Sequence, residues 1–428
     1  MKIQIKNGHL IDPASGVNGK HDIFIAAGKI AAIGIAPEGF HANKTIDATG
    51  LIVCPGLVDL SARLREPGYE YKATLESEML AAMAGGVTSL VCPPDTEPVL
   101  DEPGLVEMLK FRAKNLQQAH VYPLGALTVG LKGEVITEMA ELTEAGCIGF
   151  AQAEFPITDT QVMLHAFQYA NTFDFTVWLR PQDPYLGRGV AHSGPVAARL
   201  GLSGVSVMSE TLAMHTIFEL MRASGARVHL CRISSAAGVA LVRAAKAEGL
   251  RVSCDVAIHN VLLTDVDIGY FDSNYHLQPP LRSGRDRDAI WQGLADGTID
   301  AIVSDHTPVD DDEKLLPFGE SSPGATGLEL LLTLTLKWAE QQKVDLSVAL
   351  AKVTASAAQL AGIDAGHCKP GSSADLCLFD PNLPWTVVAK ALQSQGKNTP
   401  FLGYELTGKT VMTLVAGEIR YQGASLSE

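Results

Sequence analysis

Short apolar runs alternate with longer segments through the middle of this 428-residue chain, and this alternation is the strongest constraint on its fold. Eight runs read as strands: 57–62, 89–92, 121–127, 147–151, 175–179, 227–231, 251–256 and 301–304. Several connections have a helical composition, such as 74–84, 239–247 and 327–340. The alternation predicts a parallel sheet, and eight units predict an α/β fold with a closed (β/α)8 barrel of TIM type.

Both ends of the chain carry shorter strand-like runs separated by turn signals such as Asn7-Gly8. These runs are 3–6, 22–26, 29–33 and 51–54 near the start, and 374–379, 410–416 and 418–421 near the end. No single run could close a core. We therefore expect one small β-sandwich domain built from residues 1–55 and 366–428, with the barrel, residues 56–365, inserted between them.

The composition of the chain argues against nucleic acids and membranes as partners. The net charge is −15, and a nucleic-acid-binding protein normally presents a basic surface, so nucleic acid is not an expected partner. No apolar signal core or run of transmembrane length is present, which predicts a cytoplasmic protein that does not contact membranes. The seven cysteines form no C-x-x-C pair, so we expect buried thiols in a reducing compartment.

The first barrel strand ends in a polar cluster and a Pro-Gly turn, over residues 55–68. Chemistry in such barrels lies at the carboxyl ends of the strands. This stretch resembles the signature of the cyclic amidohydrolases, specifically the dihydroorotases, which is Asp-x-His-x-His followed by Leu-Arg-Glu-Pro-Gly. The chain keeps Asp59 and 64–68 but has Ser61 and Arg63 at the two histidine positions. The resemblance extends over nearly the whole chain and implies the amidohydrolase fold.

The resemblance also implies a site for two zinc ions, and five of the six ligand positions differ from the family pattern. The differing residues are Ser61, Arg63, Ala153, Arg180 and Arg232, whereas Asp305 is retained. Arginine stays protonated and has no lone pair to donate to a metal. It also adds positive charge where a dication would lie. We therefore expect no metal and no other cofactor.

Positions that the resemblance assigns to substrate binding differ as well. Arg65 matches the family arginine that holds the substrate carboxylate, but Asp95 stands in place of an asparagine. Gln278 replaces the asparagine of the Asn-Pro-Pro-Leu-Arg segment, and Val309 replaces the last histidine of the motif at the eighth strand. Arg65 and Asp305 are therefore interpreted as vestigial.

Two arrangements of the remaining polar residues are open. In the first, Arg63, Arg180 and Arg232 converge on Asp305 and Asp59, so that an ion-pair network fills the space of the metals. In the second, a single metal is held by a rearranged site built from Asp305 and three histidines, namely His229, His259 and His306.

The resemblance implies a catalytically inactive dihydroorotase homologue that is not an enzyme. Its expected partner is the aspartate carbamoyltransferase catalytic chain in pyrimidine synthesis, within a homo-dimer and a larger hetero-oligomer. Two alternatives stay open: an amidohydrolase with metal-free or single-metal chemistry on another cyclic amide, and a sensor of small anions in an arginine-lined pocket. The acidic run 310–313 is either a solvated loop or a partner contact.

Overall fold

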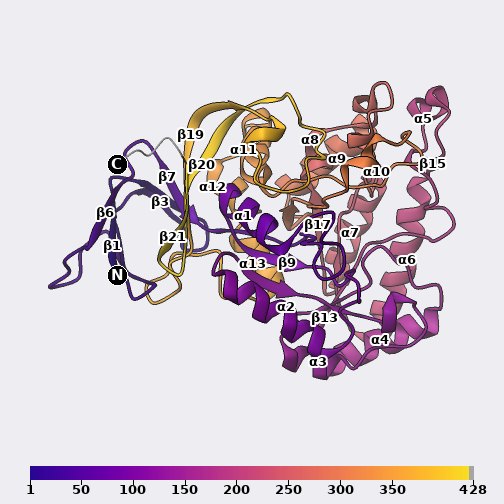
Figure 1. Ribbon diagram of the computed structural model, residues 1–428. Coiled ribbons are helices and arrows are strands. Elements are labelled where there is room, and N and C mark those ends of the chain that lie inside the picture. The colour runs from indigo at the N-terminus through magenta and orange to yellow at the C-terminus, as the bar shows by residue number, and fades with distance from the viewer. Residues whose placement is uncertain (424–428) are drawn as a thin grey trace.

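The barrel is present in the computed structural model, which describes residues 1–423 (Figure 1). All eight predicted strands occur: β8 Leu57–Asp59, β9 Val87–Cys92, β10 His120–Pro123, β12 Phe150–Ala151, β13 Thr176–Leu179, β16 Arg227–Leu230, β17 Val252–Ala257 and β18 Ala301–Val303. Their neighbours pair in parallel. The short strand β11, Gly125–Ala126, follows β10 and pairs with β12. A parallel bridge between Ala62 and His306 joins the segments after β8 and β18, so the predicted closed barrel is confirmed.

Helices follow most of the strands and surround the barrel. The longer ones are α1 Leu75–Gly85, α2 Pro103–Leu116, α4 Thr160–Thr172, α6 Val207–Ser224, α7 Ala236–Glu248, α9 Gly284–Ala295 and α11 Leu331–Gln342. The shorter ones are α3 Met139–Ala145, α5 Pro195–Leu200, α8 Ile258–Leu262, α10 Asp311–Leu315, α12 Leu346–Ala351 and α13 Ala355–Ala361. Short 3-10 turns span Val129–Leu131, Asp265–Ile268, Ser273–Tyr275 and Ala389–Ala391, and the small strands β14 Ala191–His192 and β15 Gly204–Val205 pair with each other.

For two of the predicted helices, hydrogen bonds of neighbouring residues determine where the helix begins or ends. Thr74 caps α1 by accepting a hydrogen bond from a backbone N–H, and Gly86 ends the helix with a φ of 80°, which glycine adopts without strain. The helix predicted from residue 327 begins four residues later, at Leu331. The backbone N–H of Gly327 instead donates to His306 Nδ1 at 3.1 Å. The acidic run 310–313 does not stay a loop, because Asp310 caps α10, which begins at Asp311.

Strands from both ends of the chain form two sheets beside the barrel. One sheet has the order β5-β4-β1-β6, and the other has the order β21-β20-β19-β7-β2-β3. The strands are β1 Lys2–Lys6, β2 His9–Asp12, β3 Val17–Lys20, β4 Ile23–Ala26, β5 Lys29–Ile33, β6 Lys44–Asp47, β7 Ile52–Pro55, β19 Leu376–Thr386, β20 Glu405–Val415 and β21 Glu418–Gln422. Strand β19 pairs antiparallel with β7, which joins the two ends in one sheet. The exact domain boundaries stay a prediction.

One segment of the expected C-terminal β-domain packs on the barrel instead. Val387, Leu392 and Phe401 belong to the same apolar cluster as the barrel strands and helices. Asn398 donates to the backbone oxygen of Thr307 and accepts from the N–H of Val309, both beyond β18. We call residues 392–401 the strap, because they lie against the barrel beside the end of its last strand.

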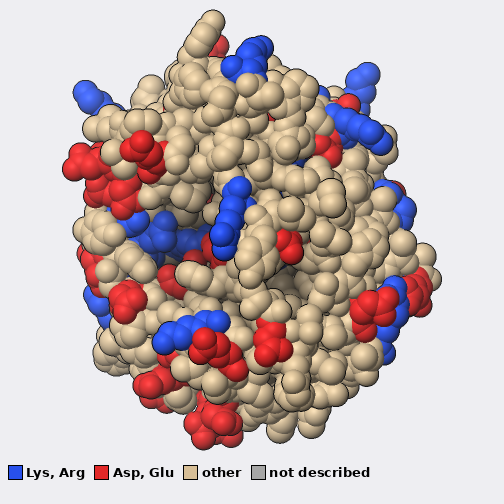
Figure 2. Space-filling model, turned by 90° about the vertical axis from the view of Figure 1, so that its right-hand side faces the viewer, with Lys and Arg blue, Asp and Glu red and all other residues tan. Residues whose placement is uncertain are grey.

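The surface matches the charge balance of the sequence. On the face drawn in Figure 2, basic side chains gather in a hollow on the left that acidic side chains surround, and elsewhere both kinds are scattered. No helix within residues 1–423 combines the length and apolar character that crossing a bilayer requires.

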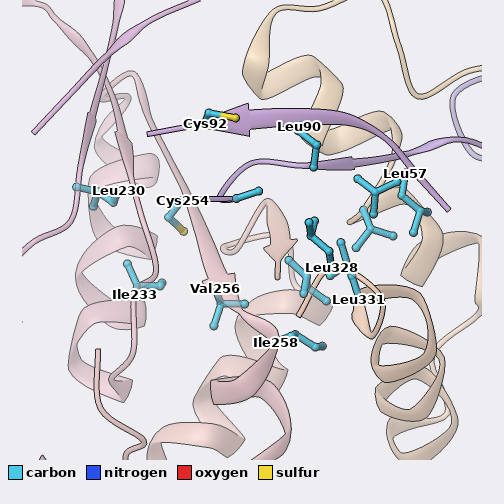
Figure 3. Packing of buried hydrophobic residues seen from close by; sticks show 14 of the residues in the cluster. Leu57, Leu90, Cys92, Leu230, Ile233, Cys254, Val256, Ile258, Leu328 and Leu331 are labelled. Atoms are coloured by element: carbon cyan, nitrogen blue, oxygen red, sulfur yellow. The ribbon is translucent and has the colours of Figure 1, made fainter. Parts of the chain in front are cut away.

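The main core lies between the strands and the helices that cover them. Figure 3 shows side chains from β8, β9, β16 and β17 directed toward the space that Leu328 and Leu331 also enter. A separate cluster fills the small domain with residues from both ends, including Ile3, Ile25, Leu376 and Leu414. Burial at roughly 25 cal/mol per Å2 of apolar surface makes these clusters the main source of folding free energy.

A buried polar contact fastens the strap to the barrel. Glu78 of α1 contacts His306 Nε2 at 2.5 Å through Oε2, and the same oxygen accepts from Ser394 Oγ at 2.6 Å. Its other oxygen accepts from the N–H of Gln395 at 3.0 Å. One carboxylate therefore joins the first helix, the segment after β18 and the strap.

We expect Glu78→Ala to destabilise the chain by about 2–4 kcal/mol, because it leaves buried donors of His306 and the strap without a partner. Chemical denaturation monitored by circular dichroism measures this change. Glu76→Ala, at an exposed position on the same helix, is the matched control and should change stability little. Equal midpoints for the two variants would contradict the role of Glu78.

Candidate functional site

Glu154 is the centre of a charged cluster at the carboxyl end of the barrel. It lies three residues beyond β12, and its Oε1 accepts from Arg63 Nη2 at 2.9 Å and from Arg232 Nη2 at 2.5 Å. Its Oε2 contacts Arg180 Nε. The three arginines follow three different strands, β8, β13 and β16, so a single carboxylate links four strand ends.

Two aspartates complete the charge balance. Asp305 Oδ1 accepts from Arg232 Nη1 at 2.8 Å and lies 3.6 Å from Arg63 Nη1. Asp95 accepts from Arg63 Nε at 2.8 Å. Three guanidinium groups thus face three carboxylates, and their formal charges cancel. We call these six residues the mouth network.

Burial and ion pairing act in opposite directions on the acids of the mouth network. Burial raises the pKa of Glu154, but Arg180, Arg232 and Arg63 outweigh it and hold that pKa well below its usual range. For Asp305, burial dominates over Arg232 and Arg63 and raises the pKa above its ordinary value. The carboxylate of Glu154 is therefore fixed as an anion, whereas Asp305 is the acid whose proton is easier to retain.

The hypothesis that the arginines converge on an acid is confirmed in part. Their side chains are 5–6% exposed and point into the cluster rather than to bulk solvent. Asp305 pairs with Arg63 and Arg232, whereas Arg180 pairs with Glu154 instead, and the inclusion of Asp59 was wrong. Asp59 accepts from the backbone N–H groups of Ser61 and Ser304 and from Ser304 Oγ. Burial raises the pKa of Asp59 to about 6.

Glu154 is the residue that sequence reasoning missed. Ala153 is one of the five positions that differ from the family ligands, and no role was predicted for the carboxylate that follows it directly. Ala153 has a φ of 48°, a left-handed conformation that turns the chain between the strand end and Glu154. Arg65, Arg232 and Asp305 also have positive φ values, at 62°, 54° and 49°. Local strain therefore concentrates at the mouth, where the network contacts offset it.

The other predicted positions lie around the mouth network. Ser61 Oγ donates to Asp305 Oδ1 at 3.4 Å. Arg65 donates through Nε to the backbone oxygen of Pro308, and burial lowers the pKa of Arg65 to about 10. Gln278 Nε2 donates to Gln182 Oε1 at 3.4 Å. Val309 is buried and turns its backbone N–H to Asn398.

The histidines of the single-metal alternative do not come together. His229 contacts Asp255 at 2.9 Å and Ser253 at 2.8 Å through its two ring nitrogens. His306 contacts Glu78, and His259 stacks on Phe401 while burial lowers its pKa to about 3. Within residues 1–423, one group of possible ligands is close enough to hold a metal, namely His229, Cys231 and Asp255, and it excludes Asp305. The structure therefore does not support a single-metal site built from Asp305 and these three histidines.

Comparisons with known proteins identify the family. A model described as "Dihydro-orotase-like" matches residues 50–237, and one described as "Amidohydrolase family" matches residues 200–420. A "Dihydroorotase-like protein" of Pseudomonas aeruginosa is 44% identical over 99% of this chain and 100% of its own length. This chain is a dihydroorotase-like member of the amidohydrolase family.

Other relatives of the dihydroorotase-like chain carry the name of an enzyme. A "Dihydroorotase" of Geobacter sp. (strain M21) is 40% identical over 99% of this chain and 100% of its own length. Among solved structures, the L-hydantoinase (dihydropyrimidinase) from Arthrobacter aurescens superposes with a TM-score of 0.88 at 25% identity, covering 100% of this chain and 97% of that one.

The prediction that this dihydroorotase-like chain is not an enzyme was wrong. Relatives that are 38–40% identical are named dihydroorotase, and the solved neighbour is a hydantoinase, which together point to an enzyme. The prediction equated changed ligand positions with loss of all activity. Three guanidinium groups argue against dications at this mouth, but they leave acid–base groups such as Asp305 in place.

A pair of zinc ions, which the resemblance to the dihydroorotases implies, does not fit the residues at this mouth. Zinc sites need neutral imidazoles, thiolates or carboxylates with free lone pairs. Here each acid of the mouth network already contacts one or more guanidinium groups, and none of those groups can serve as a ligand. Added dications would raise the positive charge of an already balanced cluster.

We expect Arg232→Ala to destabilise the chain by about 3–5 kcal/mol, because it leaves Glu154 and Asp305 short of a partner in a buried cluster. Thermal and urea unfolding measure the loss. Arg243→Ala is the matched control, since Arg243 pairs with Asp296 at 2.7 Å on an exposed surface. That change should cost about 0–1 kcal/mol. A loss no larger than that of the control would show that the mouth network contributes little.

Proposed function

We propose that this dihydroorotase-like chain acts in pyrimidine synthesis as a partner of the aspartate carbamoyltransferase catalytic chain, in a hetero-oligomer built on a homo-dimer. The observation that carries the proposal is the mouth network, which joins four strand ends by fixed charges. A barrel held in this way keeps its shape without depending on a metal supply. That property suits a constitutive member of an assembly.

Two further observations support this role. Relatives that are 44% and 43% identical, from Pseudomonas aeruginosa and Pseudomonas putida, share the qualified name "Dihydroorotase-like protein". All seven cysteines of the chain are free thiols, and six of them are buried. Free thiols are usual in reducing compartments, which agrees with a cytoplasmic location for the assembly.

Co-expression tests the assembly. We expect a tagged dihydroorotase-like chain to retain untagged aspartate carbamoyltransferase catalytic chain from the same organism, and the two to co-elute in size-exclusion chromatography at micromolar concentration. The same tag on an unrelated (β/α)8 barrel is the control. Separate elution of the two chains at that concentration would refute the proposal.

A second candidate function is metal-independent chemistry on a cyclic amide. The names dihydroorotase and L-hydantoinase among the relatives and the solved neighbour favour it. Asp305 would serve as the acid–base group, because burial raises its pKa and it lies at a strand end. Arg65 would hold a substrate carboxylate, since its guanidinium lies outside the mouth network.

Metal analysis combined with an assay separates this chemistry from the zinc-dependent kind. We expect below about 0.1 zinc per purified chain, because arginines stand at the ligand positions. Hydrolysis or cyclisation of dihydroorotate or another ureido acid that survives a chelator, and is lost in Asp305→Asn but not in Asp311→Asn, would support the second candidate. Stoichiometric zinc, with activity that the chelator abolishes, would refute metal independence.

A further inference from the structure

A cavity lies beside the mouth network, between α4, α6 and the segments that follow β12 and β13. Its volume is about 200 Å3. The wall is largely apolar and includes Ile157, Met163, Leu179, Leu212 and Ile217. Among the described residues that line it, Arg180 is the one cation. A largely apolar chamber with a small number of charged and polar groups is the usual construction of a site for a small amphipathic molecule.

Arg180 has fewer partners than the other two arginines of the mouth network. Arg63 contacts Asp95, Glu154 and Asp305, and Arg232 contacts Glu154 and Asp305. Within residues 1–423, Arg180 forms an ion pair with Glu154 alone, through Nε, and shares that carboxylate with the other two arginines. Its side chain is 6% exposed, and among the described residues neither its Nε nor its Nη2, both buried, has a hydrogen-bond partner. A buried guanidinium with an unused donor lacks an acceptor.

Two other polar side chains of the wall, Gln152 and Asp183, have hydrogen-bond partners of their own. Gln152 accepts from Thr128 Oγ1 and donates to the backbone oxygen of Leu131. Asp183 accepts from the backbone N–H groups of Tyr185 and Leu186, which offset its negative charge. Neither side chain supplies the acceptor that Arg180 lacks.

The cavity opens through an apolar rim. Phe155, Tyr185 and Leu212 line it and are 51%, 69% and 44% exposed. Large apolar side chains exposed together at a cavity entrance mark a binding surface rather than a random part of the exterior.

We propose that this cavity binds a small monocarboxylate with a compact apolar body, aromatic or branched, whose carboxylate pairs with Arg180. One cation in an apolar wall matches one negative charge. A dicarboxylate would bring a second charge without a partner, and an amino acid would place its ammonium near the guanidinium. The site is separate from the mouth network except at Arg180, and its occupancy depends neither on the partner chain nor on the reaction proposed above.

Benzoate and benzamide provide a matched pair of probes, because they share a shape and differ in charge. We expect isothermal titration calorimetry on the isolated full chain to detect benzoate, with benzamide about tenfold weaker or more. Benzoate should also raise the melting temperature in a dose-dependent manner, whereas benzamide should not at the same concentration. Equal binding of the two probes, or no binding of benzoate up to about 10 mM, would overturn the proposal.

Three variants locate the binding. Ala213→Trp on α6 fills the cavity and should abolish benzoate binding, whereas Ala223→Trp, at an exposed position on the same helix, should bind as the unaltered chain does. Arg180→Gln should weaken benzoate about tenfold or more and leave benzamide unchanged. If Ala213→Trp does not fold, Thr216→Phe on the same wall replaces it. Benzoate binding that survives filling of the cavity would place the ligand elsewhere and refute the site.

Discussion

The contact on which the mouth of this barrel depends is the sharing of one carboxylate by three guanidinium groups. Glu154 meets Arg63, Arg180 and Arg232, which come from three different strand ends. A lone buried charge of either sign would be expensive, so each member of the cluster is tolerated because the others are present. The balance fixes Glu154 as an anion and leaves Arg180 as the least satisfied cation.

The barrel was predictable because eight apolar runs with helical connections have few ways to bury their faces. Convergence of the arginines was predictable too, because the carboxyl ends of parallel strands meet at one edge. Which acids they would meet was not. Glu154 sits beyond a left-handed residue in a loop, and Asp59 is taken by backbone donors and a serine of the neighbouring strand. The spacing of residues along the sequence predicts the strands, but it does not predict the position of a carboxylate in a loop such as that of Glu154.

Membership of the dihydroorotase-like family does not by itself fix the reaction mechanism of this chain. The relatives establish a dihydroorotase-like amidohydrolase and point to an enzyme. The arginines of the mouth network argue against a zinc-dependent mechanism only, because guanidinium groups cannot coordinate zinc. Replacing a metal by ion pairs changes which reactions a barrel end can support, but Asp305 and Arg65 are still present at that end. Activity therefore has to be measured separately from metal content.

The strap carries a consequence for how the protein is made. Glu78 is synthesised long before two of its partners, Ser394 and Gln395, which lie more than three hundred residues later in the chain. Strand β7 likewise cannot pair with β19, its partner in the sheet, until that strand has been synthesised. Domains often fold as their N-terminal parts leave the ribosome. Here neither the small domain nor the buried contacts of the first helix can be completed until the segment from β19 to the strap has been synthesised, so the nascent chain must stay soluble in a partly assembled form until then.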